Sequence, residues 1–226
     1  MSDSMRYSIR IAAASLMCFA LAGAAFAQQE FAPPQGKGRV VVVASGLSGV
    51  EHYSTVSKEI AQLGYDVVLF DGAAMEGTRG EALRTAIAQA QAMPHALPGK
   101  VALVSFSAGG GISLYYGTQW PEQVAGAVLW YPATSFIKDV PGWAGRLKVP
   151  VLMFAGEKDT YRNNCCVVSM AHTLDDAAKA AGLPFELITY PKTDHDFVKG
   201  GSHYNSEAYN DAMTRTATKL KELLGN

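Results

Sequence analysis

Six short apolar runs along the chain are continuous rather than alternating with polar residues. They are rich in Val, Ile, Leu or Ala, are mostly bounded by Gly, Pro or Asp, and cover residues 39–44, 66–70, 100–105, 125–130, 149–154 and 185–190. Runs of this length and composition predict strands whose side chains are buried on both faces of a sheet. The segment before them, residues 28–37, contains two prolines and a glycine and is expected to be an extended lead-in.

Longer stretches with helical spacing of apolar residues separate these runs. They cover residues 53–63, 78–93, 108–118 and 165–181, and a last one at 206–224 follows the sixth run. Buried strands that alternate with helices indicate a parallel sheet covered on both faces. The sequence therefore predicts an α/β fold of three layers, with a minimal, mostly parallel sheet of about six strands.

The first 27 residues have the pattern of an export signal. Two arginines precede an apolar stretch over residues 11–24, and residues 25–27 form the small-x-small pattern that signal peptidase cleaves. The apolar stretch is shorter than the roughly 20 residues needed to span a bilayer, which favours a cleaved signal over a membrane anchor. We therefore expect a signal peptide at 1–27 and one domain over 28–226. This domain would be periplasmic or secreted, with no stable membrane insertion.

Composition and charge exclude several classes of protein. The 226 residues are 49% hydrophobic and 17% charged, and 19 Lys and Arg residues nearly balance 20 Asp and Glu residues. These values exclude a disordered or collagen-like chain, and the lack of basic excess argues against a nucleic-acid partner. A small molecule with little charge is the expected partner. The sequence contains no signal that specifies an oligomeric state.

The strongest chemical signal lies at the end of the third predicted strand. Residues 105–109 read Ser-Phe-Ser-Ala-Gly, a variant of the G-x-S-x-G turn in which Ser107 is the central serine. Small residues two positions before and after Ser107 permit a strained turn from strand to helix that exposes the hydroxyl. A phosphate-binding loop would need a lysine after its last glycine, but isoleucine follows Gly111. Ser107 is therefore the predicted nucleophile, and an incidental serine in a glycine-rich turn is the alternative.

A serine hydroxyl needs a base to take its proton and a carboxylate to orient that base. With this type of turn, the partners follow in the chain order serine, acid, histidine. Asp159 follows the fifth predicted strand and His195 follows the sixth. Because parallel strands end at the same edge of a sheet, we expect Ser107, Asp159 and His195 to meet there as a catalytic triad.

Other histidines and carboxylates fit these roles less well. His95 precedes the serine and His172 lies on a predicted helix, so both are expected to be solvated. His52 follows the first strand, where it is suited to line a pocket. His203, in a loop rich in glycine and serine, is the alternative base, and Glu157 is the alternative acid.

Two backbone N–H groups are predicted to form the oxyanion hole. One belongs to Ala108, directly after the nucleophile, and the other to Leu47, in the glycine-rich loop after the first strand. An ordinary glycine-rich loop would have the same sequence features. The expected pocket walls are the segment 132–148 and three aromatic residues: Phe106, Tyr131 and Tyr161.

Several motifs together resemble the α/β-hydrolases and, within them, the dienelactone hydrolase-like branch. They are the loop 45–50, the strand 64–71, the serine turn with its extra Gly110, the turn 156–159, the segment 190–197 and the helix 208–216. The resemblance covers nearly all of residues 40–226. It implies an α/β-hydrolase fold with ester or lactone hydrolysis.

This chain departs from the branch at three positions. Dienelactone hydrolases have a cysteine nucleophile, whereas position 107 is serine, and they carry a glutamate where this chain has Gly46. They hold the substrate carboxylate with arginines. In this chain Lys199 is the residue expected to bind the substrate. Its ammonium group is a compact charge and lacks the paired N–H donors with which an arginine guanidinium binds a carboxylate. The resemblance therefore implies a serine-nucleophile variant rather than a true dienelactone hydrolase.

Two adjacent cysteines, Cys165 and Cys166, follow the predicted signal. Export would permit a disulfide. Neighbouring Cα atoms are about 3.8 Å apart, however, below the roughly 4.4–6.8 Å that is usual for a bridge, which favours two small buried residues at the start of a helix. No His and Cys spacing matches a zinc pattern, so the sequence predicts no metal site.

The sequence as a whole predicts an exported serine hydrolase that cleaves small carboxylic esters or lactones through an acyl-enzyme, without a cofactor. The lack of a large lid insertion favours small substrates. A thioesterase or a small peptidase would use the same residues. A non-catalytic binding protein of the same fold is the alternative from another class.

Overall fold

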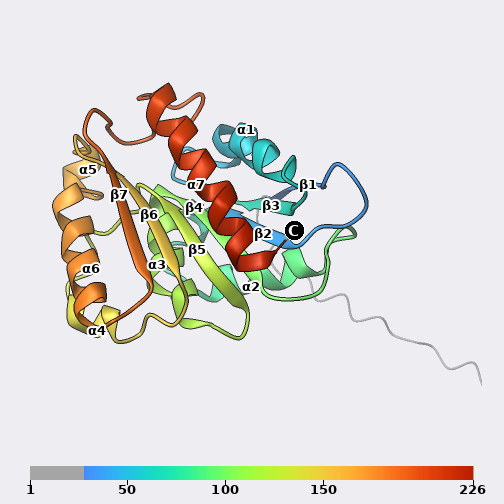
Figure 1. The fold of residues 1–226 in the computed structure, drawn as a ribbon, viewed down its shortest axis with the longest axis horizontal. Helices are drawn as coiled ribbons and strands as arrows, with labels where there is room; N and C mark the ends of the chain where they lie inside the picture. Colours follow the sequence, from blue (N-terminus) through green and yellow to red (C-terminus); the bar gives the residue numbers. More distant parts are fainter. Residues whose placement is uncertain (1–27, 226) are drawn as a thin grey trace, which may run out of the picture.

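A seven-stranded sheet with helices on both faces forms the centre of the molecule (Figure 1). The computed structural model describes residues 28–225, so the predicted signal at 1–27 lies outside the described residues. The strand order is β1-β3-β2-β4-β5-β6-β7, and all neighbouring strands are parallel except β1 and β3. The strands are β1 (Gln28–Phe31), β2 (Val40–Ala44), β3 (Asp66–Phe70), β4 (Val101–Phe106), β5 (Val124–Trp130), β6 (Val151–Gly156) and β7 (Phe185–Tyr190).

Strands β2 to β7 are the six that the apolar runs predict. Their side chains alternate between two cores: Val40 and Val42 pack on one face of the sheet, and Val41 and Val43 pack on the other. Each fully buried valine contributes about 1.5–3 kcal/mol relative to an exposed one. The continuous apolar runs therefore have a direct cause, because both faces of these strands are covered.

The first strand, β1, is an addition to the predicted sheet. It lies in the segment expected to be a lead-in and pairs antiparallel with β3, with Gln28 opposite Phe70. Its residues are only partly buried at the edge of the sheet. An edge strand with one open side needs no apolar run, which explains why the pattern of apolar residues did not reveal it.

The helices divide into two layers. Side chains of α1 (Val50–Ala61) and α7 (Ser206–Leu224) belong to one core, and those of α2 (Glu81–Gln91), α3 (Ser107–Tyr115), α4 (Val140–Ala144) and α6 (Val168–Ala180) belong to the other. Figure 1 shows α1 and α7 together on one side of the sheet. The elements that the sequence did not predict are short: α4, α5 (Tyr161–Asn164) and the 3₁₀ turns η1 (Ala73–Met75) and η2 (Gly117–Gln119). None of the helices from residue 28 to 225 combines the length and apolar character needed to cross a membrane.

Candidate active site

Ser107 occupies the sharp turn between β4 and α3. Its backbone φ is 47°, in the left-handed region that non-glycine residues seldom adopt, which is a strained conformation typical of functional sites. Gly109 packs directly against the loop after β2: its N–H donates to the Ser45 carbonyl, and a Cβ there would lie 2.5 Å from the same oxygen. Two residues before the nucleophile, Ser105 is buried and hydrogen-bonds Ser113. Small residues at both positions thus fit the close packing around the turn.

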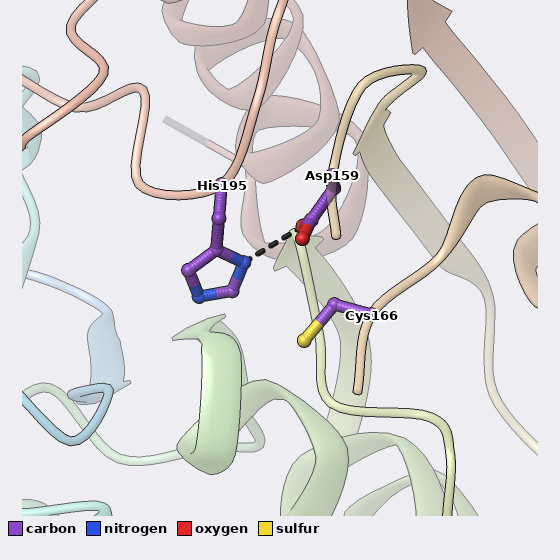
Figure 2. Close-up of side chains that lie close together, drawn as sticks. All are labelled: Asp159, Cys166 and His195. Carbon is purple, nitrogen blue, oxygen red and sulfur yellow. Dashed lines mark hydrogen bonds and ion pairs between the residues drawn. The ribbon is translucent and has the colours of Figure 1, made fainter. Parts of the chain in front are cut away.

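The structure brings Ser107, His195 and Asp159 together at the carboxyl edge of the sheet. Nε2 of His195 lies 3.0 Å from Oγ of Ser107, and Nδ1 lies 2.7 Å from Oδ2 of Asp159. Figure 2 shows Nδ1 of the imidazole facing the carboxylate. All three residues are buried, and the second oxygen of Asp159 accepts the N–H of Tyr161. This is the geometry in which a histidine can accept the proton of a serine hydroxyl while a carboxylate fixes its orientation.

Two tyrosine rings hold the imidazole of His195. The ring of Tyr161 stacks on it with centroids 4.4 Å apart and planes 4° from parallel, and Tyr131 meets it edge-on at 4.7 Å. Tyr131 is fully buried, and its φ of 39° is again in the left-handed region. The two contacts leave the imidazole little freedom to rotate. Tyr161 also lines the cavity beside Ser107, whereas Tyr131 and the segment 132–148, which were expected as pocket walls, are not among the residues that line it.

A small cavity opens beside Ser107. Its volume is about 80 Å³, and its walls are Leu47, Ser48, Tyr53, Ser107, Tyr161, His195, Asp196 and Ser202. Pockets for drug-sized ligands measure about 300–1,000 Å³, and a water molecule in the liquid takes about 30 Å³. The cavity therefore has room for a short chemical group only.

The loop after β2 lies against the nucleophile. A Cβ on Gly46 would be 3.0 Å from Cβ of Ser107 and 2.5 Å from the hydroxyl oxygen of Tyr53. The loop thus carries Leu47, whose side chain lines the cavity, close to the serine. The N–H of Ala108 is one of the first in α3, which have no intrahelical acceptor. Both predicted oxyanion donors are therefore near Ser107, and their role stays a prediction.

Tyr53 is a site residue that sequence reasoning missed. Its pKa is raised, first by burial and then by the negative charge of Asp196, and the pKa of the fully buried Tyr131 is raised well above its ordinary value by burial. Both hydroxyl groups thus keep their protons at neutral pH. The only sequence signal for Tyr53 is its position in the first turn of α1, just after the glycine-rich loop.

Two predicted substrate contacts lie elsewhere. Lys199 pairs with the carboxylate of Glu59 on α1 and lies over the ring of Tyr209, so it does not reach the cavity. Phe106 is fully buried and packs against Tyr53 and neighbouring aromatic rings, so it belongs to the core beneath the site and does not line the cavity. The alternation of side chains along β4 turns Phe106 into the core beneath α1.

Three of the four remaining histidines have polar partners of their own. Nε2 of His52 lies 2.7 Å from Asp196, a residue of the cavity wall. Nδ1 of His203 lies 3.0 Å from the backbone carbonyl oxygen of His195 and 3.2 Å from the hydroxyl of Ser202. The exposed His172 agrees with its prediction, but His95 is paired with a carboxylate rather than simply solvated.

The two adjacent cysteines differ from the prediction. Cys165 and Cys166 form a disulfide, and they lie in the turn before α6 rather than at the start of that helix. In a helix, successive side chains would be rotated apart by about 100°; a turn is free of that constraint. Figure 2 shows Cys166 beside Asp159 and His195, and its sulfur, a carboxylate oxygen of Asp159 and a ring nitrogen of His195 lie within 4.8 Å of one another. The turn also supports the segment after β5, because the carbonyl of Cys165 accepts the N–H groups of Thr134 and Ser135.

Fold and site together define a class of protein. A mostly parallel sheet, a strained serine turn after one strand, and a carboxylate and a histidine after later strands characterise the α/β-hydrolase fold. The model of the dienelactone hydrolase family matches residues 69–224, which is more than half of the chain. The chain belongs to this family, as the resemblance in its sequence implies.

One relative matches this chain over part of its length. Protein usf from Aquifex pyrophilus is 27% identical over 129 residues, which cover 56% of this chain and 53% of that protein. This chain thus spans about half the length of that relative.

Two solved structures share the fold. Esterase 2 of Thermogutta terrifontis, phosphorylated by paraoxon, has a TM-score of 0.68 and 16% identity, with 88% of this chain and 90% of that chain covered. The dienelactone hydrolase-like promiscuous phosphotriesterase P91, from metagenomic libraries, has a TM-score of 0.69 and 20% identity, with 84% and 89% covered.

Proposed function

We propose that this chain hydrolyses small carboxylic esters, with Ser107 as nucleophile, His195 as base and Asp159 as the orienting acid. The observation that carries the proposal is the continuous hydrogen-bonded row from Ser107 Oγ through the imidazole to Asp159, with distances of 3.0 and 2.7 Å. Family membership supports ester hydrolysis. The signal pattern of residues 1–27 supports action after export.

The reaction follows from these positions. Nε2 of His195 takes the proton of Ser107 as the serine oxygen attacks the ester carbonyl, and the N–H groups of Leu47 and Ala108 stabilise the resulting oxyanion. The imidazolium, held by Asp159, then gives its proton to the leaving alcohol. Water activated by the same imidazole attacks the acyl-enzyme, and the serine is released.

The size of the cavity predicts the preferred substrates. A space of about 80 Å³ holds an acetyl or butyryl group but not a long acyl chain. We expect kcat/KM to fall at least about tenfold from p-nitrophenyl butyrate to p-nitrophenyl octanoate, since a longer chain loses its enclosed contacts. A panel of p-nitrophenyl esters from acetate to palmitate, corrected with Ser107→Ala protein as the blank, measures this. A kcat/KM that rises with chain length would show that substrates bind outside this cavity.

A second prediction concerns the loop beside the nucleophile. Gly46→Ala introduces a methyl group only 2.5 Å from the hydroxyl oxygen of Tyr53, so either the loop that carries Leu47 or the ring of Tyr53, which lines the same cavity, must shift. We expect kcat for p-nitrophenyl acetate to fall about 100-fold, comparable to loss of one oxyanion donor.

Gly145→Ala is the matched control for this substitution. A Cβ on Gly145 would be 3.7 Å from its nearest neighbour, an ordinary contact, so kcat should stay at the wild-type value. Circular dichroism of both variants checks that they are folded. A folded Gly46→Ala variant with kcat within threefold of wild type would show that this loop does not contribute to the oxyanion hole.

A further inference from the structure

Three side chains from distant segments meet at the other end of the sheet. Glu30 lies on β1, Asp66 begins β3, and His95 lies in the connection between α2 and β4. One ligand atom of each lies within 4.8 Å of the other two, and Nδ1 of His95 is 2.9 Å from Oε1 of Glu30. The cluster is thus built by the tertiary fold, and no local spacing of residues reveals it.

Asp66 gives this cluster an unusual property. Its side chain is fully buried, and neither carboxylate oxygen has a hydrogen-bond partner among residues 28–225. The pKa of Asp66 is raised to about 6, first by burial and then by the nearby charge of Glu30, while the charge of His95 opposes the rise. A buried carboxylate without a partner is costly, so the cluster has two acidic groups that a bound cation would stabilise.

We propose that Glu30, Asp66 and His95 bind a divalent transition-metal ion, with Zn²⁺ as the ion that best matches one imidazole nitrogen and two carboxylate oxygens. Ligand bonds of about 2.0–2.2 Å in a tetrahedral site place ligand atoms roughly 3.3–3.6 Å apart. Glu30 and His95 would therefore have to move closer to Asp66 than the present separations of up to 4.8 Å when an ion binds. The side chain of His95 is 44% exposed, so the ion has a path from solvent, and water takes the fourth position.

The site would have a structural role. Asp66 is the first residue of β3 and lies at the amino end of a parallel strand, whereas the candidate triad follows the carboxyl ends. A bound ion would fasten the four-residue edge strand β1 to β3 and to the connection after α2. Its effect should therefore be seen in stability and not in turnover.

Thermal unfolding of the tag-free chain, freed of metal with EDTA and dialysed, tests this proposal. With ZnCl₂ at roughly 100 times its Kd, we expect Tm to rise by about 5–10 °C. His95→Gln keeps a donor for Glu30 but removes the imidazole, and this variant should lose the shift. Asp66→Asn is a second variant that should lose it, and His172→Gln, at an exposed helix position, should keep it. Titration with CoCl₂ should give visible absorption bands in the wild type and in His172→Gln only.

Three results would overturn the proposal. The first is a wild-type Tm that ZnCl₂ leaves unchanged, which would indicate that Glu30 and Asp66 share a proton instead. The second is an equal shift in His95→Gln and wild type. The third is a shift that disappears in His195→Ala but not in His95→Gln, which would place the ion at Asp159 and His195 of the candidate active site. None of these results depends on the proposed esterase activity.

Discussion

Replacing Ser107 or His195 with alanine is expected to lower kcat for a short-chain ester by about 10⁴-fold or more. Ser107→Ala removes the attacking oxygen, and His195→Ala removes the acceptor that lies 3.0 Å from it. Because the two groups act as one unit, the double variant should be little worse than either single variant. Steady-state kinetics with p-nitrophenyl acetate measures the loss.

Two variants close to the site serve as controls for this prediction. Ser48→Ala removes another serine that lines the cavity, and His203→Ala removes a histidine whose Nδ1 contacts the hydroxyl of Ser202 and the backbone carbonyl of His195 rather than Ser107. Both should keep most of the wild-type activity. More than a few per cent of activity in a folded Ser107→Ala or His195→Ala variant would exclude the assignment, and inactivity of His203→Ala would reopen the choice of base.

Asp159→Asn is expected to lower kcat by roughly 10³–10⁴-fold with little change in KM. The carboxylate of Asp159 accepts the Nδ1 proton at 2.7 Å, which leaves Nε2 free to accept the serine proton. An amide in the same place can present its NH₂ group to Nδ1 and so favour the wrong tautomer. The same assay measures kcat and KM separately.

Glu157→Gln is the matched control for the acid. Glu157 lies two residues earlier in the same loop, and its carboxylate accepts a hydrogen bond from Thr189 instead of the imidazole. This variant should keep kcat near the wild-type value. If Asp159→Asn were nearly as active as wild type, the acid role would pass to another carboxylate while the roles of Ser107 and His195 would stand.

The sequence predicts most of the sheet because burial on both faces leaves a clear pattern. The run 66–70 matches β3 at both ends, whereas β1 is missed because its partly exposed Gln and Glu residues lie at an edge. The short helix α5 is missed for a different reason. Arg162 and Asn163 have positive φ within it, so no helical periodicity exists there to be found.

Site residues are predictable where strand topology places them. Ser107, Asp159 and His195 each follow a parallel strand, and parallel strands end at one edge. The direction of a side chain beyond that edge depends on loop conformation, which a sequence pattern does not contain. Lys199 therefore turns toward Glu59, and Tyr53 reaches the cavity from a helix without a motif to indicate it.

Covalent labelling shows whether Ser107 is an activated nucleophile. The chain is incubated with a fluorophosphonate, and intact mass, the modified peptide and remaining esterase activity are followed together. We predict one adduct per chain, located on Ser107, with activity lost in proportion to labelling and with much slower labelling of His195→Ala. An adduct on another residue, or equal labelling of Ser107→Ala, would contradict the account.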